Sequence, residues 1–290
     1  MLLSAPAKIN LLLDVLGKRG DGYHELHSVM LSISLCDTVE LMVVPAKESL
    51  IRVCTDRSYL PADERNTAWK AAARYLAAVG QTAEVDIRLR KSIPVGAGLG
   101  GSSADAAAVL WGMDRLMGNG MDEREKIALA ASVGADVPFM MQGGCAEANG
   151  IGEQLRALPV PAGLPIVISK PRPSASTKAI FTNLDALVDP FHPDAGKMLD
   201  AVQRNDWQGI GEAVGNTLES VTAALCPDVT RLKQMFEQCG ALGTAMSGSG
   251  TAVFGIFASE SAASAAVRNI SRRYPQTWSV RPVPVGITEK

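Results

Sequence analysis

Pro94-Val-Gly-Ala-Gly-Leu-Gly-Gly-Ser-Ser-Ala-Asp105 is the stretch that decides the fold of this chain. It follows Val85–Lys91, where apolar and polar side chains alternate as they do in a half-buried strand. It leads into the alanine-rich segment Ala104–Met117, which is predicted to be a helix that stops at Gly118. The glycine-rich stretch therefore joins a strand to a helix.

This loop has the composition of a phosphate-binding site. Glycines let a ligand approach the backbone closely, and the first amides of a helix carry the positive end of its dipole. We expect Ser102 to be the N-cap of the helix, with Asp105 three residues on, so that these amides point back into the loop. The sequence therefore predicts an anion site at this turn.

Two other kinds of nucleotide-binding loop share features with this stretch. Gly96, Gly98 and Gly101 satisfy G-x-G-x-x-G, which is also the pattern of nicotinamide and flavin sites. Such a site follows the first strand of a βαβ unit, with an acidic residue about twenty residues on. Here the loop lies a third of the way along the chain, and the nearest acids, Asp114 and Asp122, fall in helical sequence. No Walker pattern occurs, and a turn that binds nothing is disfavoured by four glycines and two serines.

The whole composition excludes several classes of protein. The chain has 290 residues and a formal net charge of -2, with acidic and basic residues interspersed, so no nucleic-acid or anionic-membrane surface is expected. No apolar run approaches about twenty residues, and we expect a cytoplasmic protein. The five cysteines are scattered, and the three histidines lack metal-ligand spacing, so neither a disulfide framework nor a structural zinc is expected.

The N-terminal segment Ser4–Leu16 is predicted to be a strand that carries Lys8 and Asn10 on one face. A strand with one solvated face would explain both, but a lysine among leucines and valines costs free energy unless it meets an anion. The glycine-bounded turn that follows presents Tyr23 and His24. These rings can stack on a planar ligand and bind its edge, although an ordinary hairpin with a half-buried aromatic fits the spacing equally well.

Further elements follow from local patterns. Strands are predicted at Met30–Val44 and Leu50–Cys54, with turns at Asp37-Thr38 and Lys47–Ser49, and helices at Asn66–Ala78, with Asn66 as N-cap, and at Asp122–Ser132. Asp136 lies beyond the second helix among apolar residues, with no basic residue near it in sequence. A surface turn and a catalytic or ligand-binding carboxylate both remain open for it.

Pro159–Pro165 is the clearest shift in composition, and we place the domain boundary there, giving domains 1–162 and 163–290. The second half is predicted to hold a strand at Pro165–Ser169, short helices, and a second glycine–serine loop, Gly243–Gly250, before the strand Thr251–Phe257. A helix and a closing strand complete an α+β pattern. The second loop is a hairpin turn or, with the first loop, faces one anionic ligand.

Three motifs taken together resemble those of the GHMP kinase superfamily: Pro6–Asn10, Pro94–Ser103 and Gly243–Gly250. The resemblance spans nearly the whole chain. It implies a two-domain α+β fold, with an N-terminal ribosomal-protein-S5-domain-2-like domain and a C-terminal ferredoxin-like domain, and an active site in the cleft between them. Lys18–His24 further resembles the members that act on a cytidyl substrate in the non-mevalonate pathway of isoprenoid synthesis.

The resemblance implies an ATP-dependent small-molecule kinase that uses Mg²⁺ and transfers the phosphoryl group directly and in line to a hydroxyl. Lys8 and Asp136 match the catalytic pair. A carboxylate can orient the hydroxyl and accept its proton, and an ammonium group can offset the charge that builds on the phosphoryl oxygens.

The resemblance also implies the binding residues. The ATP-binding positions are Asn66, Lys91, Pro94, Gly96, Ala97, Gly98, Leu99, Gly100, Gly101, Ser102 and Ser103. Asn66 and Lys91 lie near adenine, and Ser102 or Ser103 reaches the phosphates or their Mg²⁺, with Ser103 as the metal candidate. The substrate-binding positions are Asn10, Tyr23, His24, Phe181, Gly248 and Ser249, with Gly250 completing the third motif. Phe181 is expected to supply the second face of an aromatic sandwich around cytosine.

Three alternatives remain: a GHMP kinase for homoserine or a mevalonate-like alcohol, a nucleotide-binding regulator without catalysis, and an oxidoreductase with a glycine-rich loop. The expected partner is a small molecule, and the expected state is a monomer or weak homodimer.

Overall fold

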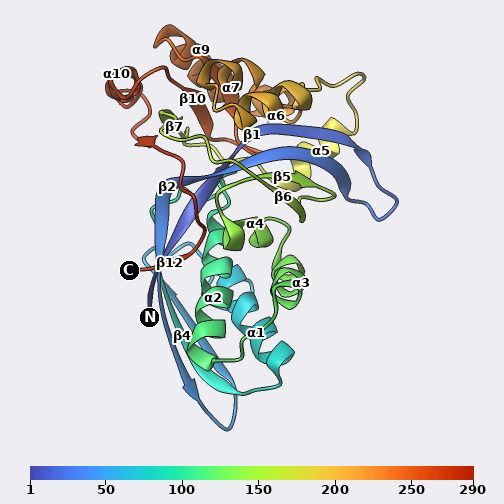
Figure 1. Ribbon diagram of the computed structural model, residues 1–290, viewed down its shortest axis with the longest axis vertical. Coiled ribbons are helices and arrows are strands. Elements are labelled where there is room, and N and C mark those ends of the chain that lie inside the picture. Colours follow the sequence, from blue (N-terminus) through green and yellow to red (C-terminus); the bar gives the residue numbers. More distant parts are fainter.

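The computed structural model describes residues 1–290. In it, a long antiparallel ribbon of β1 (Leu2–Lys18) and β2 (His24–Pro45) reaches from one group of helices to the other (Figure 1). The first half continues with β3 (Leu50–Thr55), α1 (Thr67–Val79), β4 (Ala83–Arg90), α2 (Gly101–Met117), α3 (Glu123–Val133), α4 (Val137–Gln142), β5 (Cys145–Asn149) and β6 (Gln154–Leu158).

The second half holds most of the short helices. Its elements are β7 (Ile166–Ser169), α5 (Thr177–Leu184), α6 (Ala195–Gln203), α7 (Trp207–Ala213), β8 (Gly215–Asn216), α8 (Glu219–Leu225), α9 (Asp228–Gln238), β9 (Gly243–Met246), β10 (Val253–Ile256), α10 (Glu260–Ile270), β11 (Thr277–Val280) and β12 (Thr288–Glu289). The predicted α+β class is confirmed.

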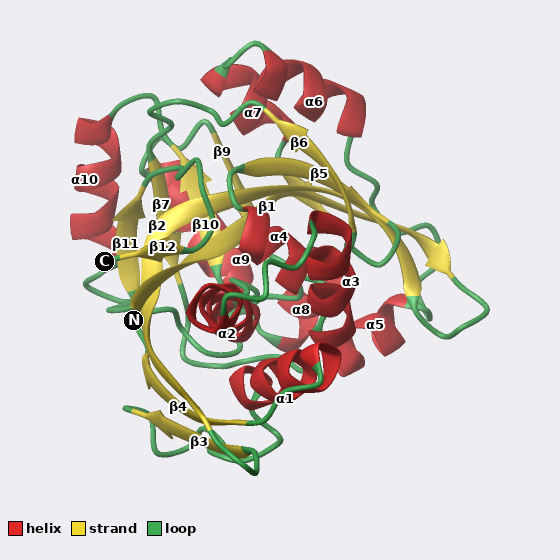
Figure 2. Cartoon of the chain, turned by 60° about the horizontal axis from the view of Figure 1, so that its bottom comes forward, coloured by secondary structure: helices red, strands yellow, loops and turns green.

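The larger sheet has the strand order β12-β1-β2-β4-β3, and β5 pairs with β2 and β6 while β8 pairs with β1. The neighbouring strands β3 and β4 are parallel and are connected through α1, whereas β1, β2 and β4 run antiparallel. Helix α2 packs against β1 and β2, with α1 beside it (Figure 2). The sheet therefore supports the helix that follows the glycine-rich loop.

Buried and more exposed side chains alternate along β4, and this alternation shows which face of the sheet the helices cover. Val85, Ile87 and Leu89 are buried, while the residues between them are half-buried or exposed. The buried side of β4 joins the same hydrophobic cluster as Ala68 and Ala72 of α1. The predicted half-buried strand before the loop is therefore confirmed.

The smaller sheet has the order β11-β7-β10-β9, with every pair antiparallel. With the helices between β7 and β9 and with α10 before β11, this is the βαββαβ arrangement of a ferredoxin-like domain. Along β7, Ile166 and Ile168 join the core that extends into the first half, whereas Val167 joins a second core with Phe236 and Ala263. Both faces of this sheet are therefore covered.

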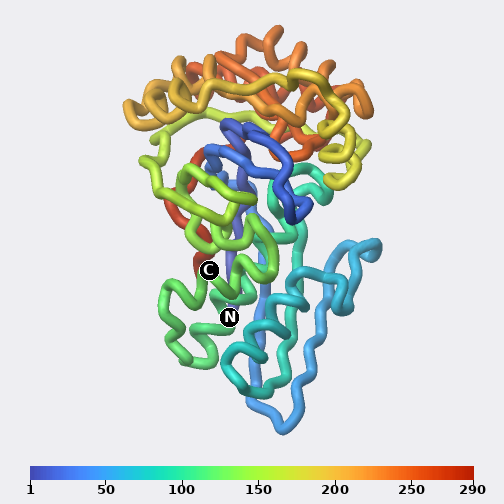
Figure 3. Tube along the Cα trace, turned by 90° about the vertical axis from the view of Figure 1, so that its right-hand side faces the viewer, coloured from blue at the N-terminus to red at the C-terminus, as the bar shows by residue number.

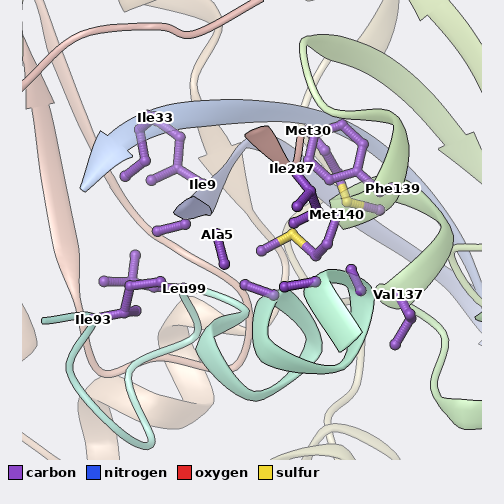
Figure 4. Packing of buried hydrophobic residues seen from close by; sticks show 14 of the residues in the cluster. Ala5, Ile9, Met30, Ile33, Ile93, Leu99, Val137, Phe139, Met140 and Ile287 are labelled. Atoms are coloured by element: carbon purple, nitrogen blue, oxygen red, sulfur yellow. The ribbon is translucent and has the colours of Figure 1, made fainter. Parts of the chain in front are cut away.

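A layer of apolar side chains lies directly behind the glycine-rich loop. Figure 4 shows Ile9 and Ile33 from the sheet facing Leu99 from the loop, with Met140 of α4 beside them. All four side chains are at most 1% exposed. This packing fixes the backbone of the loop from its rear side.

Two local predictions are wrong. Asp37-Thr38 is not a turn, because β2 continues through it and Asp37 is fully buried. Ser102 is not the N-cap of α2, because the helix begins at Gly101 and its cap is Gly100, in the left-handed conformation. Asp105 is then inside the helix and pairs with Lys91. Tertiary contacts with Lys91 have overridden the local preferences of both aspartates.

The two ends of the chain lie close together in the larger sheet. Leu3 pairs with Glu289, and the amide of Lys290 donates to the carbonyl of Leu2. Figure 3 shows both termini near the middle of the molecule, below the second half. None of the helices combines the length and the apolar character that a membrane crossing requires.

The C-terminal segment around Gly286 packs against the backbone of Gly143, the residue that follows α4. Gly143 has φ +71°, and a Cβ there would lie 2.0 Å from the amide nitrogen of Gly286. Gly143 also has ψ −162°, a combination that essentially only glycine adopts, so we expect Gly143→Ala to lower the free energy of unfolding by about 1–3 kcal/mol for the backbone conformation and by about 1–3 kcal/mol more for overpacking. Gly120→Ala, with φ +59° and open space around the site, should show a backbone cost without the overpacking. Equal losses in urea denaturation of the two variants would contradict this packing.

Candidate active site

Strand β1 brings Lys8 and Asn10 into the interior on the same face. The ammonium of Lys8 is 2.7 Å from the side-chain oxygen of Asn10, to which it donates. The side-chain amide group of Asn10 in turn donates to the hydroxyl of Ser28 at 2.8 Å. Lys8 is only 4% exposed. This network orients a buried positive charge, which needs such partners to offset its desolvation.

Asp136 supplies the opposite charge. Its carboxylate lies 3.7 Å from the ammonium of Lys8, and its side chain is 34% exposed, so it faces both the lysine and open space. The residue occupies the N-cap position of α4 but makes no side-chain capping bond. The carboxylate is therefore available for chemistry. The structure brings together two residues that are far apart in sequence.

The glycine-rich loop turns sharply between β4 and α2. Gly96, Gly98 and Gly100 have φ of +62°, +75° and +71°, which favour glycine. Between them Leu99 is buried, and its carbonyl accepts the amide of Lys8 at 3.0 Å. The loop is thus hydrogen-bonded to the strand that carries the catalytic lysine candidate.

The second glycine loop packs directly on the first. The hydroxyl of Ser247 donates to the carbonyl of Gly98 at 2.9 Å and accepts the backbone amide of Asn10 at 3.2 Å. The amide of Ala252 donates to the carbonyl of Ala97 at 3.1 Å. All three sequence motifs therefore meet at this point.

A cavity of about 750 Å³ opens beside this junction. It is bounded by both halves of the chain. Its lining includes Lys8, Asn10, Tyr23, His24, Ser103, Asp136, Phe181, Gly248, Ser249 and Gly250. Every predicted catalytic and substrate-binding residue lies here.

A second cavity, of about 370 Å³, lies on the other side of the loop. Its lining includes Asn66, Lys91, Ser102 and the loop residues Pro94 to Gly101. Both cavities are also bounded by Gly96, Gly98, Gly100, Ser103 and Asp136. A ligand in one cavity and a ligand in the other would meet at Asp136.

The polar ends of two predicted adenine neighbours are engaged within the chain. The side chain of Asn66 accepts the amide of Ala68 and donates to the carbonyl of Pro61, so it caps α1 as the sequence predicts. The ammonium of Lys91 contacts Asp37 and Asp105. Both residues line the second cavity, but these groups are directed toward other parts of the protein.

The tip of the β1–β2 hairpin reaches α5 in the second half (Figure 1). The rings of His24 and Phe181 lie 4.7 Å apart between centroids, at an interplanar angle of 31°. These two rings pack on each other, so no base lies between His24 and Phe181, and a sandwich between Tyr23 and Phe181 stays a prediction. The ring of Tyr23 is 61% exposed at the same cavity and is available for stacking.

Sequence reasoning missed Asp185 and Thr177. Asp185 accepts a hydrogen bond from the ammonium of Lys18 at 2.5 Å and lies 2.6 Å from Nε2 of His24, and these contacts hold the pKa of its carboxyl below the usual value. The hydroxyl of Thr177 is 2.8 Å from that of Ser249. Both line the larger cavity. No local motif marks either residue as part of a site. The sequence indicates only that both lie near Phe181 along the chain.

Two family models match this chain. Residues 66–144 match the model described as GHMP kinases N terminal domain, and residues 198–276 match the one described as GHMP kinases C terminal. The matched segments contain the phosphate loop with Asp136 and the second glycine loop, respectively.

Curated relatives and solved structures agree with these matches. Proteins of Bacillus cytotoxicus and Bacillus cereus named 4-diphosphocytidyl-2-C-methyl-D-erythritol kinase are 43% and 42% identical over 256 residues, covering 88% of both chains. A crystal structure of 4-(cytidine 5'-diphospho)-2C-methyl-D-erythritol kinase is similar with 35% identity and a TM-score of 0.79, covering 97% of this chain and 99% of that one. Homoserine kinase from Cytophaga hutchinsonii, at 23% identity, 99% and 96% coverage and a TM-score of 0.78, shares the fold.

The junction of the two glycine loops generates a prediction. A Cβ at Gly98 would lie 2.0 Å from the carbonyl oxygen of Ser247. We expect Gly98→Ala to force the loops apart and to weaken nucleotide binding by about tenfold or more, equivalent to about 1.4 kcal/mol. Calorimetric titration with ATP measures this. Gly118→Ala, with a similar φ of +66° but open space, is the control and should bind nucleotide normally. Unchanged affinity in Gly98→Ala would contradict the close approach of the loops.

Proposed function

The chain belongs to the GHMP kinase family, and from this membership we propose that it is an ATP-dependent kinase of 4-diphosphocytidyl-2-C-methyl-D-erythritol. It phosphorylates the 2-hydroxyl of this substrate in the non-mevalonate pathway to isoprenoid precursors. The observation that carries the proposal is the pair of cavities that meet at Ser103 and Asp136, next to Lys8. One cavity suits the nucleotide and the other suits the alcohol.

The reaction is direct in-line transfer. With ATP phosphates against the loop and the alcohol in the larger cavity, Asp136 orients the hydroxyl and accepts its proton as the oxygen attacks the γ-phosphorus. The bond from that phosphorus to the ADP oxygen breaks, and ADP leaves. Lys8, which lies 3.7 Å from Asp136, offsets the charge that is spread over the phosphoryl oxygens. No covalent enzyme intermediate is needed.

The donors around the loop fit a nucleotide-bound magnesium ion. Mg²⁺ prefers oxygen ligands and usually keeps phosphate and water ligands rather than an all-protein cage. Ser103 has a hydroxyl at the boundary of both cavities and is the residue that would hold the ion. The bound ion would neutralise charge on the triphosphate.

The far end of the larger cavity suits the cytidyl group. Tyr23 offers an exposed aromatic face, and His24, packed on Phe181 and bonded to Asp185, offers a ring edge of fixed orientation. A planar base with donors and acceptors on its edge matches such groups. This recognition separates the proposed substrate from homoserine and mevalonate, which have no such ring.

The test of the function is ADP release from Mg·ATP with the cytidyl substrate, compared with homoserine, mevalonate and methylerythritol phosphate. We expect turnover with the cytidyl substrate only. Turnover with another alcohol would keep the phosphate-loop assignment and reject the cytosine site. Absence of turnover with all four, together with ATP binding, would favour a nucleotide-binding regulator.

The role of Asp136 gives a second prediction. Asp136→Asn keeps the shape of the side chain but removes the proton acceptor, so we expect kcat to fall by about 10²–10⁴-fold while ATP affinity is retained. Steady-state kinetics and calorimetry measure the two effects. Asp122→Asn changes the N-cap of α3, away from both cavities, and is the matched control. Normal turnover in Asp136→Asn would reject the assigned role.

A further inference from the structure

Behind the phosphate loop lies an ionic cluster that the reaction does not use directly. The ammonium of Lys91, which follows β4, contacts the carboxylates of Asp37 in β2 and Asp105 in α2. The three residues are 6%, 0% and 4% exposed, respectively. Burial at this depth is costly for charged groups unless they are paired and hydrogen-bonded.

The cluster is attached to both ends of the loop. At the start of the loop, one oxygen of Asp37 accepts the backbone amides of Ser92 and Ile93 at 2.6 and 2.8 Å. At its end, the ammonium of Lys91 donates to the carbonyl of Gly101, the first residue of α2, at 3.3 Å. Asp37 and Lys91 therefore connect the sheet to the residues on either side of the phosphate-binding glycines.

Its charges are unequal, since two carboxylates share one ammonium. Burial raises the pKa of Asp105 to about 7. One oxygen of Asp105 is buried without any hydrogen-bond partner, which penalises the ionised form. Around the backbone of Lys91, Asp56 accepts its amide and Arg57 donates to its carbonyl. Asp56 and Arg57 are therefore charged neighbours of the cluster.

We propose that Asp37 and Asp105 are positioning residues that, through Lys91, hold the two ends of the phosphate loop in the geometry that binds nucleotide. The proposal rests on the proposed function only in taking ATP as the ligand of the loop. It gives Lys91 a role beside the cavity rather than one of direct contact with the base. Lys91 and Asp105 border the second cavity, and neither aspartate borders the larger cavity assigned to the alcohol.

Asp37→Asn is the sharpest disruption. The native carboxylate accepts at both oxygens, one from backbone amides and the other from Lys91. A carboxamide has only one oxygen, so its NH₂ must face either the amides or the ammonium, and all of these are donors. The loop must then detach at one of the two points.

The matched control is Asp114→Asn, at the other end of α2. Asp114 is also largely buried, lies 3.0 Å from the ammonium of Lys126 and accepts the amide of Met121 at 3.2 Å. It lines neither cavity. A loss of stability without an effect on the loop should therefore appear in this variant.

The first experiment measures the Kd of a non-hydrolysable Mg·ATP analogue by calorimetry, with the Tm of each variant and the KM of both substrates. Asp37→Asn should weaken nucleotide binding by about tenfold and raise the KM of ATP in parallel, with the KM of the alcohol changed less than about twofold. Asp114→Asn should lower Tm but leave Kd within about twofold. Equal nucleotide affinity in the wild type and Asp37→Asn, or equal loss in the control, would overturn the proposal.

The second experiment uses Asp105→Asn, which mimics the protonated carboxyl. At about pH 8 most of the wild-type carboxyl is ionised and holds the ammonium of Lys91, whereas the asparagine carries no charge, so we expect Asp105→Asn to bind the nucleotide analogue about tenfold more weakly. At about pH 6 the difference should shrink, because most of the wild-type carboxyl is then protonated and has lost the ion pair as well. The ratio of the wild-type Kd to the Asp105→Asn Kd cancels titration of the nucleotide and should fall as the pH rises. Equal affinity of Asp105→Asn and the wild type at about pH 8 would overturn the proposal, even if Asp37→Asn does not fold.

Binding readouts keep this inference separate from the proposed reaction. If the wild type binds nucleotide but releases no ADP with any alcohol, the proposed function fails while the cluster can still be tested by both experiments. If turnover is normal and the variants bind nucleotide like the wild type, the inference about Asp37 and Asp105 fails alone.

Discussion

The close contact between the two glycine loops is the constraint on which the rest of the active site depends. A side chain at Gly98 would collide with the backbone of Ser247, so the two loops can approach this closely only because Gly98 has no side chain. Ser247 then bonds to both Gly98 and Asn10. With this junction in place, the strand carrying Lys8, the phosphate loop and the second glycine loop border one cavity.

Buried charge is used twice near this junction, and in different ways. The ammonium of Lys8 contacts the neutral side-chain oxygen of Asn10 and one partly exposed carboxylate, so it can act on a ligand that enters the cavity. Lys91 is enclosed by two buried carboxylates and directed away from the solvent. Because low-dielectric surroundings strengthen each interaction, the first lysine is suited to chemistry and the second to holding backbone in place.

The errors of the sequence interpretation have a common cause. Asp37 was expected in a turn and Ser102 at a helix cap, both from preferences that such residues show toward their own neighbours. In the structure Asp37 pairs with Lys91, which follows β4, and Gly100 rather than Ser102 precedes the helix. Asn66, whose capping bond is entirely local, was predicted correctly. A distant charged partner competes with the local preference at Asp37, and none does at Asn66.

The sequence by itself determined the strand–loop–helix at Pro94–Asp105, the amphipathic periods of the main strands and helices, the family, and the residues to be inspected at the site. These depend on interactions between residues that are neighbours along the chain and on motifs that can be read from the sequence alone. Only the tertiary structure decided that Lys8 meets Asp136, that His24 packs on Phe181 and Asp185, and that two cavities share one carboxylate. Such contacts join residues from different sheets and helices, so they exist only after the shared core has fixed the two halves against each other.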